Sequence, residues 1–444
     1  MENILLNEIL EARENRVKKQ KMLLEKFQKP LLCFTMNIPG PKKLDRDVSI
    51  GFFVGNKLLE DALKRCRVLY AEQKRLITGC EGYYVVDLPA KKLKELAVEL
   101  EDIDPIGRLF DLDVIDTDGR KLSREELGLP RRSCLLCDQE AVVCASRRTH
   151  TLDELTDRVG LLLYITARRE LCEYVASRAY FALQQEVSTT PKPGLVDRNN
   201  RGSHRDMGPR EFFASAVALR PFFCRFAEAG FLSRNQAPEE TFRQLRPIGL
   251  EAEAAMYKAT RGVNTHKGAI FSLGILCAAC GRLDPYDWTP ETLLTECVRM
   301  TKGLCEKDFA GVTADTAQTA GEKLFALYGI TGVRGQAEAG FPAVLEVGLP
   351  IFQEGLNRGL SENDAGAVAL LHLLAATDDT NLISRSNRQT QLAVKDQIAQ
   401  LLAENPFPTT DVIEGLDREF IGKNFSAGGS ADLLALTIFL HFIC

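Results

Sequence analysis

The sequence predicts an α+β amino-terminal domain followed by a larger all-α carboxy-terminal domain. Short β-favouring runs alternate with helical patterns in the first third of the chain, whereas helical periodicity dominates from about Thr151 to the end. A chain of 444 residues with 45% hydrophobic content is also too long for one ordinary core. Two domains are therefore the expected organisation.

Four short runs in the first third favour strands and are separated by Pro, Gly and Asp. They are Leu31–Met36, Ile50–Val54, Tyr83–Leu88 and Leu112–Ile115. A helix is expected before the first of them, because apolar residues recur at helical spacing at Ile4, Leu5, Ile9 and Leu10. This mixture indicates an α+β domain.

The pattern changes near Thr151, which forms the sequence signature of a capping box with Glu154. Apolar positions then keep a helical period from Leu152 to Leu183, and the boundary is placed in this stretch, near Ile165. The expected domains are residues 1–165 and 166–444. Further helices are expected at Glu251–Thr260, Ala269–Cys280, Ala365–Ala376 and Ala431–Phe442.

The composition excludes several classes of partner. A formal net charge of -5 argues against a nucleic-acid partner. The most apolar segment, Leu433–Cys444, is shorter than the roughly 20 residues of a membrane span, so no membrane partner is expected. The odd number of cysteines, 13, and a charged Met1–Gln20 segment unlike a secretory leader indicate a reducing compartment. We expect a cytoplasmic protein.

The first polar loop of the helical domain is Glu186-Val-Ser-Thr-Thr-Pro-Lys-Pro-Gly-Leu-Val-Asp197, and Asp206 follows it. Pro191 and Pro193 force extended backbone around Lys192 and hold its ammonium group on a stiff arm. This arrangement suits a contact with phosphate. A rigid loop between helices, with a solvated lysine, explains the same pattern equally well.

A second polar segment follows Glu253 and ends in Gly262-Val-Asn-Thr-His-Lys-Gly268. Its first glycine is expected to end one helix, and the turn from Asn264 opens the next. His266 and Lys267 then lie at a helix N-terminus, which favours anions, so a triphosphate would fit there. His266 alone would serve equally well as a capping or packing residue.

The remaining polar connections are charged, and two of the three are rich in glycine. They are Gly332-Val-Arg-Gly335, Asp378-Asp-Thr-Asn381 and Ser426-Ala-Gly-Gly-Ser-Ala-Asp432. Gly428 and Gly429 free the backbone N–H groups at the start of the last helix, and Asp432 falls in its first turn. Each connection could be a plain turn with a helix cap, but a purely structural helical bundle rarely needs so many.

Three motifs carry a resemblance to a known family: Thr190-Pro-Lys-Pro-Gly-Leu-Val-Asp197, Gly262-Val-Asn-Thr-His-Lys-Gly268 and Gly428-Gly-Ser-Ala-Asp-Leu-Leu-Ala435. From about Ala167 to the end, the chain resembles the triphosphoribosyl-dephospho-coenzyme A synthases. The resemblance implies an all-helical domain that joins ATP to 3'-dephospho-coenzyme A and releases adenine. Ala427 stands where Pro is expected, and Gln336 stands where Glu is expected, so Gln336 receives no role.

In the implied reaction, a ribose 2'-hydroxyl of dephospho-coenzyme A attacks C1' of ATP through an oxocarbenium-like transition state. It needs a carboxylate base and groups that hold the triphosphate. The candidates for the base or for a Mg²⁺ ligand are Glu253, Asp206, Asp378 and Asp379. The candidates for phosphate contacts are Lys192, Lys267 and Arg334, and the other expected substrate contacts are Asn264, His266, Gly428 and Gly429.

In the amino-terminal domain, Asp111 and Asp113 fall on one side of a predicted strand, because side chains repeat every second residue. Two carboxylates on one face can share Mg²⁺ and position a nucleotide phosphate. Solvated acids at a strand edge are the plain alternative. Arg108 and Arg124 could hold phosphates or pair with these acids.

Cys134, Cys137, Cys144 and His150 have spacings compatible with a Cys₃His zinc site. Such a closed site would be structural, because it leaves no position open for substrate. Ordinary buried thiols are the alternative.

This half of the chain also resembles a known family, over nearly all of residues 1–155. The motifs are Arg13-Glu-Asn-Arg16 with Gln20, Phe34-Thr35 with Pro39-Gly-Pro41, Gly107–Val114, and the segment from Arg132 to His150. They resemble the apo-citrate lyase phosphoribosyl-dephospho-coenzyme A transferases, also called holo-acyl-carrier-protein synthases. The resemblance implies transfer of the phosphoribosyl-dephospho-coenzyme A group to a serine of the apo-acyl carrier (gamma) subunit of citrate lyase, with release of pyrophosphate.

The two resemblances together favour a bifunctional enzyme in which the second domain makes the substrate of the first, with Mg²⁺ as the expected cofactor. Two other functions are compatible with the sequence. The helical domain could be a ribosyl transferase or hydrolase acting on another nucleotide, beside a non-catalytic, zinc-stabilised amino-terminal module. The chain could also be a non-catalytic scaffold for the lyase complex.

Overall fold

A computed structural model describes residues 6–103 and 105–444 of the chain. The expected helical positions Ile4 and Leu5 lie outside the described residues. The chain forms two compact units. The first unit comprises Met1–Leu171 with Asp284–Tyr286, and the second comprises Cys172–Leu283 with Asp287–Cys444.

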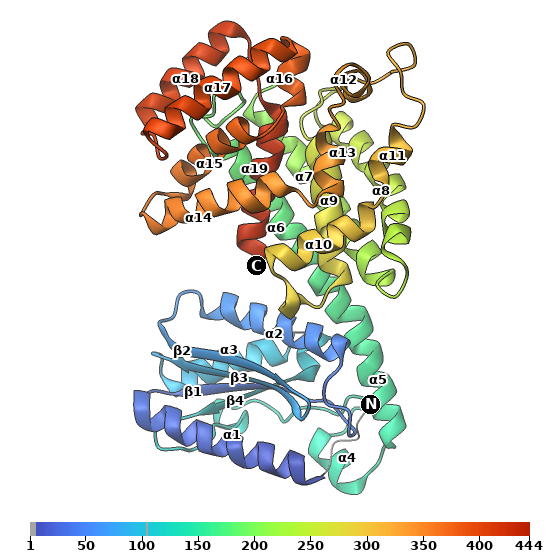
Figure 1. Cartoon of the computed structure of the whole chain (residues 1–444). Coiled ribbons are helices and arrows are strands. Elements are labelled where there is room, and N and C mark those ends of the chain that lie inside the picture. Colours follow the sequence, from blue (N-terminus) through green and yellow to red (C-terminus); the bar gives the residue numbers. More distant parts are fainter. Residues whose placement is uncertain (1–5, 104) are drawn as a thin grey trace. The chain divides into compact units, whose positions relative to one another are not determined.

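The first unit contains a four-stranded antiparallel sheet with the strand order β2-β3-β1-β4. The strands are β1 (Leu31–Met36), β2 (Val68–Leu76), β3 (Gly79–Val86) and β4 (Phe110–Ile115). The helices are α1 (Leu6–Phe27), α2 (Arg46–Leu63), α3 (Ala90–Glu101), α4 (Ala141–Arg147) and α5 (Leu152–Leu162). Figure 1 shows α1 on one face of the sheet and α2 and α3 on the other. The α+β prediction for this half is confirmed.

One predicted strand is wrong, because Ile50–Val54 lies inside α2. The helix begins after Asp45, whose carboxylate accepts a hydrogen bond from the Val48 N–H at 2.9 Å. The apolar run is buried in this helix, and the Phe52 ring stacks on Phe34 of β1 at 5.0 Å. A short apolar run that is buried on all sides has the same composition in a strand and in a helix, so periodicity does not separate them.

The two faces of the sheet differ in character. The face toward α2 and α3 is apolar, as the contacts of Phe34 with Phe52 and with Phe110 illustrate. The face under α1 is apolar only at one end, where Leu23 and Leu24 pack on Leu31, among other residues. The other end of this face carries polar side chains and is therefore the candidate functional site of the first unit.

The regular elements described in the second unit are all helices, as predicted. Its helices are α6 (Arg168–Ser188), α7 (Pro209–Leu232), α8 (Pro238–Ala259), α9 (Lys267–Arg282), α10 (Pro290–Thr301), α11 (Leu304–Asp308), α12 (Ala320–Tyr328), α13 (Gly332–Glu338), α14 (Leu349–Asn357), α15 (Glu362–Ala376), α16 (Thr380–Arg385), α17 (Arg388–Glu404), α18 (Thr410–Lys423) and α19 (Gly428–Ile443). Each of the four helices named from the sequence falls within one of these, apart from the last residue of Glu251–Thr260, which caps α8.

The core of the second unit is built around α9, α15 and α19, which are apolar over most of their circumference and buried along most of their length. Helices α7 and α9 approach closely at Gly230, where an added Cβ would lie 2.0 Å from the Ala278 carbonyl oxygen. Helices α9 and α19 meet near their first residues, where an added Cβ at Gly268 would lie 2.0 Å from Asp432 Oδ2, so two of the polar motifs come together there.

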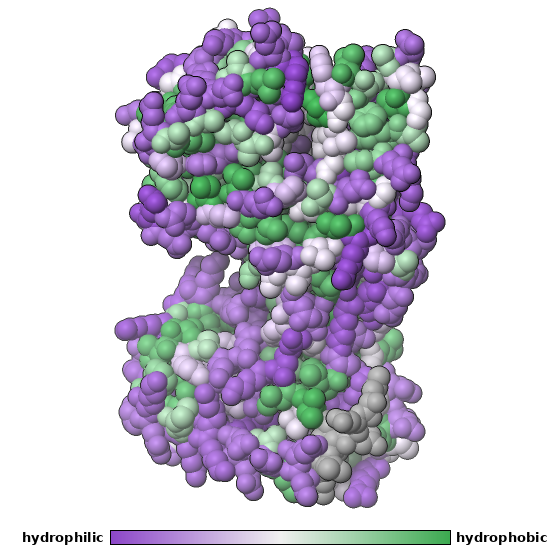
Figure 2. Space-filling model, viewed as in Figure 1, coloured by the Kyte–Doolittle hydropathy of each residue, from purple (hydrophilic) through white to green (hydrophobic). Residues whose placement is uncertain are grey.

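The capping box at the start of α5 is confirmed, since the Thr151 hydroxyl accepts from the Glu154 N–H and the Glu154 carboxylate accepts from the Thr151 N–H. The domain boundary near Ile165 stays a prediction. Among the described residues, no helix is long and apolar enough to cross a membrane. Figure 2 shows hydrophilic and hydrophobic residues interspersed over the visible face of both units.

Candidate active sites in the two units

The polar end of the sheet face under α1 gathers side chains from three strands. Strand β1 lies between β3 and β4, so Thr35 is opposite both Glu81 and Asp111, and Cys33 is opposite both Tyr83 and Asp113. These positions alternate with buried apolar residues and therefore share one face. The pairing of Asp111 and Asp113 on one face follows from this register.

The two aspartates have partly satisfied carboxylates. Thr35 Oγ1 donates to Asp111 Oδ2 at 3.2 Å, and Lys121 Nζ lies 2.5 Å from Asp113 Oδ1. Burial raises the pKa of Asp113, and the negative charge of Asp111 raises it further, although Lys121 opposes both effects. The end of the sheet thus holds two neighbouring acids whose effect on each other Lys121 and Lys94 offset only in part, an arrangement that favours a bound cation.

Helix α1 extends this polar cluster. Arg16 Nη2 lies 2.8 Å from Glu81 Oε1, and the Tyr83 hydroxyl donates to Glu81 Oε2 at 2.6 Å. Gln20 Nε2 donates to the Cys33 sulfur at 3.4 Å. Arg16 and Gln20 belong to the motifs that carry the family resemblance. Through these contacts, their side chains lie on the same face of the sheet as the two aspartates.

The cysteine cluster lies around α4. One ligand atom from each of Cys134, Cys137, Cys144 and His150 lies within 4.8 Å of all the others. Cys137 Sγ is 3.5 Å from Cys144 Sγ and 3.3 Å from His150 Nε2. Three sulfurs and one imidazole at this mutual spacing form the donor set of a closed tetrahedral zinc site.

The two arginines considered as phosphate ligands in the first unit are occupied. Arg108 Nη2 donates to the carbonyl oxygens of Ser133 and Cys134 beside a cavity of about 620 Å³. Arg124 pairs with Asp102 and Glu101. Both guanidinium groups therefore hold the backbone and the acids around the sheet, and any role toward phosphate stays a prediction.

The second unit contains a cavity of about 1160 Å³. The polar motifs from separate parts of the sequence line it together. Predicted residues in its wall are Asn264, His266, Lys267, Arg334, Asp378, Asp379, Gly428 and Gly429. Three cations to which the sequence assigned no role also line it, namely Arg385, Arg388 and Lys395.

Three predicted residues are not in the cavity wall. Lys192 is fully buried, and its Nζ forms an ion pair with the Glu186 carboxylate and a 2.7 Å hydrogen bond with the Glu186 carbonyl oxygen. Glu253 Oε2 lies 2.9 Å from Lys267 Nζ. Asp206 is exposed and lies 4.0 Å from His204. Direct substrate contacts of these three side chains stay predictions.

The Asp379 carboxylate connects the start of α16 to the start of α19 by hydrogen bonds. Its Oδ1 accepts from the N–H groups of Asn381 and Leu382, and its Oδ2 accepts from the N–H and hydroxyl groups of Ser430. Gly429 allows this approach, because a Cβ there would lie 3.1 Å from Asp379 Oδ2. Four donors satisfy the buried carboxylate, which leaves no lone pair for a metal ion.

The neighbouring Asp378 is paired instead with cations. Its two oxygens lie 2.9 Å from Arg388 Nη1 and 3.3 Å from Lys395 Nζ. Burial alone would raise the pKa of Asp378, but Arg388 and Lys395 outweigh it and lower the pKa. Asp378 is therefore held as a carboxylate whose charge is already matched.

Two histidines in the cavity wall are neutral. Burial and Arg385 lower the pKa of His204 to about 4, and Arg385 Nη2 donates to its Nδ1, so Nε2 carries the proton toward Ser426 Oγ. Burial and Lys192 lower the pKa of His266 to about 3. His266 Nδ1 is 2.7 Å from Ser215 Oγ, whereas its buried Nε2 has no hydrogen-bond partner among the described residues.

Comparison with known proteins covers both units. Residues 172–444 match the family described as ATP:dephospho-CoA triphosphoribosyl transferase, CitG. Residues 4–164 match the family described as apo-citrate lyase phosphoribosyl-dephospho-CoA transferase, CitX. A protein of Haemophilus influenzae named CitXG is 36% identical over 451 residues, which cover 98% of this chain and 96% of the relative. A protein CitXG of Leuconostoc mesenteroides subsp. cremoris is 33% identical over 464 residues, covering 99% and 97% respectively.

This chain belongs to the CitXG family. It is a transferase with a CitX region followed by a CitG region, and the pair fits the biosynthesis of the citrate lyase prosthetic group. The sequence-based prediction of fold class, enzyme class and function is thereby confirmed. The 1160 Å³ cavity lies wholly within the CitG region, and the polar end of the sheet lies wholly within the CitX region.

Sequence reasoning missed several polar residues of both regions. Strand pairing in the CitX region brings Glu81 and Tyr83 beside the two aspartates. Lys121 reaches Asp113 because the chain turns back after β4. Arg388 and Lys395 of the CitG region sit on α17, at helix positions that resemble any solvated face. The one sequence signal for Arg388 and Lys395 is their positive charge, which could pair with an acidic residue in a loop such as Asp378.

Proposed function

We propose that the CitG region joins ATP to 3'-dephospho-coenzyme A with release of adenine, and that the CitX region transfers the phosphoribosyl-dephospho-coenzyme A group to a serine of the apo-acyl carrier subunit of citrate lyase. The observation that carries this proposal is the CitG cavity, which combines a volume of about 1160 Å³ with both carboxylates and cations in its wall. Both substrates carry phosphate chains and ribose hydroxyls, and a site of this size and polarity suits them.

In the CitG region, the cations are proposed to bind the phosphate chains. Lys267 lies at the start of α9 and Arg334 lies on α13, and both line the cavity. Their partners in the structure are Glu253 at 2.9 Å and Asp308 at 2.8 Å, and a phosphate chain would compete with these carboxylates for the two cations. Asn264, His266 and the backbone at Gly428 and Gly429 would supply neutral hydrogen bonds, as helix N-termini do for anions. The charges of these cations would offset the charge of the triphosphate within the cavity.

In the CitX region, Asp111 and Asp113 are proposed to hold a Mg²⁺ ion. The fit rests on two carboxylates on one face, the raised pKa of Asp113 and the incomplete neutralisation by Lys121. When bound, Mg²⁺ would neutralise charge that develops on the leaving pyrophosphate. The chain's own groups, Thr35 and Lys121, would hold the two carboxylates in place.

Asp378 and Asp379 do not fit the Mg²⁺ site that was predicted for them. The oxygens of Asp379 accept from four donors, and those of Asp378 face Arg388 and Lys395. We therefore propose no metal at this pair. Asp379 instead holds the starts of α16 and α19 together in the cavity wall.

A structural zinc ion is proposed for the cluster of Cys134, Cys137, Cys144 and His150. The donor set and the mutual spacing within 4.8 Å support it. Zinc there would tie the segment around α4 together, where few apolar residues are buried. None of the thirteen cysteines forms a disulfide in the structure, and a reducing, cytoplasmic location is proposed on this ground.

The proposal is tested by incubating the protein with ATP, 3'-dephospho-coenzyme A, Mg²⁺ and the apo-acyl carrier subunit, followed by intact-mass measurement of the carrier. The expected result is a mass gain of one phosphoribosyl-dephospho-coenzyme A group and adenine release that requires dephospho-coenzyme A. Release of the base without dephospho-coenzyme A would favour the alternative ribosyl hydrolase. Binding of the carrier without a mass gain would favour the scaffold.

A further inference from the structure

Four carboxylates line the CitG cavity, and three of them have a matched set of partners. Glu186 forms an ion pair with buried Lys192, Asp378 pairs with two cations, and Asp379 accepts four hydrogen bonds. Asp432 is the fourth. The sequence placed Asp432 in the first turn of the last helix but gave it no role, and it has no cation within ion-pair distance among the described contacts.

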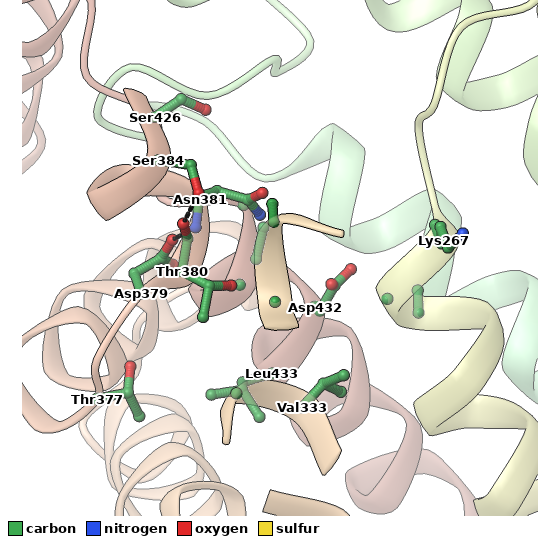
Figure 3. Close-up of a pocket in the computed structure, with 18 of the residues that line it drawn as sticks. Lys267, Val333, Thr377, Asp379, Thr380, Asn381, Ser384, Ser426, Asp432 and Leu433 are labelled. Carbon is green, nitrogen blue, oxygen red and sulfur yellow. Dashed lines mark hydrogen bonds between the residues drawn. The ribbon is translucent and has the colours of Figure 1, made fainter. Parts of the chain in front are cut away.

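Asp432 points from α19 toward the start of α9. Its Oδ2 occupies the space beside Gly268, where an added Cβ would lie only 2.0 Å away. Figure 3 shows its carboxylate directed into the space between α9, which carries Lys267, and α16, which carries Thr380 and Asn381. The carboxylate thus lies between two walls of the cavity and not in the packed core.

The charges around Asp432 are mostly negative. Glu186 of α6 and Asp379 at the start of α16 both act on it, and burial adds to their effect, so the pKa of Asp432 is raised well above its usual value. The hydrogen bond with the Ala269 backbone opposes this only in part. The nearby groups at the start of α9 are Lys267, which is paired with Glu253, and neutral His266.

A second, independent observation also points to a ligand at this position. His266, at the residue before α9, is only 3% exposed, and its Nε2 has no hydrogen-bond partner among the described residues. An unpaired buried imidazole nitrogen costs free energy, so a native structure keeps one mainly where a bound molecule completes it. His266 and Asp432 both line the cavity at the start of α9, where His266 is the cap residue and Asp432 lies beside Gly268.

We propose that Asp432 is the catalytic base of the CitG reaction, and that His266 Nε2 makes a neutral hydrogen bond to a substrate beside it. This inference rests on the proposed function. Asp432 takes the proton from the ribose 2'-hydroxyl of dephospho-coenzyme A as that oxygen forms its bond to C1' of ATP. The C1'–N9 bond breaks, adenine keeps the electron pair and takes a proton from water, and Asp432 then returns its proton to the solvent.

The other acids and bases of the cavity are less suited to this step. A base works best when its pKa lies near the working pH. Ion pairs lower the pKa of Asp378, and burial lowers that of His266 to about 3, which makes both weak bases. Burial raises the pKa values of Glu186 and Asp379 as well, but Lys192 and four hydrogen-bond donors occupy their oxygens. Asp432 combines a raised pKa with a carboxylate in the cavity wall that has no cation partner among the described contacts.

The decisive variant is Asp432→Asn, assayed by adenine release from ATP in the presence of dephospho-coenzyme A. We expect the turnover rate to fall by roughly 10²- to 10⁴-fold, as for loss of a general base. Binding of ATP should stay within about threefold of wild type. Thermal unfolding of the variant at pH 8 should occur at the same temperature as wild type or at a higher one. The reason is that a carboxylate whose pKa is raised in the folded state destabilises that state when the pH is above this pKa, and asparagine has no such charge. The matched control is Asp411→Asn, which alters an exposed acid in the first turn of α18 and should leave adenine release unchanged.

The pH profile supplies a readout that a structural role would not move. The wild-type rate should fall as the pH is lowered through the raised pKa of Asp432, that is, well above the value for an ordinary aspartate. The residual rate of Asp432→Asn should lack this acid limb. As a second variant, Gly268→Ala places a methyl group against the carboxylate and should also slow adenine release, whereas Gly249→Ala, in open space on α8, should not.

Adenine release by Asp432→Asn within about threefold of the wild-type rate would overturn the inference, as would loss of ATP binding that accounts for the whole defect. An acid limb that persists in the variant would also overturn it. Failure of the proposed function looks different, because the wild-type protein would then release no adenine in response to dephospho-coenzyme A.

Discussion

Two lysines of the CitG motifs, both predicted as phosphate contacts, have opposite surroundings. Lys192 has a 1% exposed side chain and is paired with Glu186, whereas the Lys267 side chain is 54% exposed at the mouth of α9. The first therefore holds a buried acid of the cavity wall in place. The second forms only a partly exposed ion pair with Glu253, which a ligand phosphate could replace.

Replacing these two lysines by alanine should separate stability from binding. We expect Lys192→Ala to lower the free energy of unfolding by about 3–5 kcal/mol, because it leaves the Glu186 carboxylate buried and unpaired. Lys267→Ala should change stability by about 1 kcal/mol or less, since it breaks only a partly exposed ion pair, while the KM for ATP rises. Urea unfolding and adenine release are the measurements, and a reversed pattern would contradict the assignment. Transfer of pre-made intermediate to the carrier should be unaffected by Lys267→Ala.

Asp111 and Asp113 carry the corresponding prediction for the CitX region. Asp111→Asn and Asp113→Asn should each slow carrier modification by roughly 10²-fold or more, because electrostatic stabilisation of the leaving pyrophosphate is lost. Folding should survive, since asparagine nearly matches aspartate in shape. The measurement is the rate of carrier mass gain with pre-made intermediate and saturating Mg²⁺.

Adenine release by the same two variants is the internal control and should stay at the wild-type rate, because its residues lie in the other unit. If both variants modify the carrier at the wild-type rate, the two acids are only the solvated end of a strand.

At the scale of elements, the segment from Ser133 to His150 depends on its four metal-binding side chains. The only regular element there is α4, which has a single buried residue, Cys144. We expect about one zinc per chain by elemental analysis, and we expect Cys137→Ser to lower the zinc content and the unfolding temperature of the first unit. The exposed-serine variant Ser146→Ala on the same helix is the matched control. Zinc-free protein with an unchanged unfolding temperature would end this proposal.

The elements also show where local sequence patterns stop being informative. Leu31–Met36 was predicted as a strand and is one, because its composition and its flanking Pro30 and Asn37 agree with its burial between two strands. Ile50–Val54 has a similar composition but lies in a helix, because a polar cap at Asp45 and the contact of Phe52 with Phe34 decide its conformation. Strand β2 was missed because its half-exposed sequence carries charges on a sheet edge.

At the scale of the whole chain, the product of the CitG region is the proposed substrate of the CitX region. Linking two such activities raises the effective concentration of the intermediate. A mixture of two variants, Asp113→Asn and Asp432→Asn, should nevertheless modify the carrier, since each supplies the half-reaction that the other lacks. We expect a lag before modification begins and a rate that falls when both chains are diluted.

The single chain carrying both substitutions is the control and should be inactive at any concentration. If the mixture gives no modification although each variant retains its own half-reaction, the intermediate does not leave the chain that makes it.

The sequence by itself determined the order of an α+β part and a helical part, the motifs, and through them the family and its chemistry. These depend on local patterns and on residue identity, which the chain carries wherever it folds. The geometry of the sites was decided by tertiary packing. The loop at Gly194 is fixed by the Asp417 carboxylate, 223 residues away, and Asp432 meets the start of α9 only because α9 and α19 pack in one core. Which acid keeps a free oxygen and which is consumed by donors depends on such distant partners, and no local spacing encodes them.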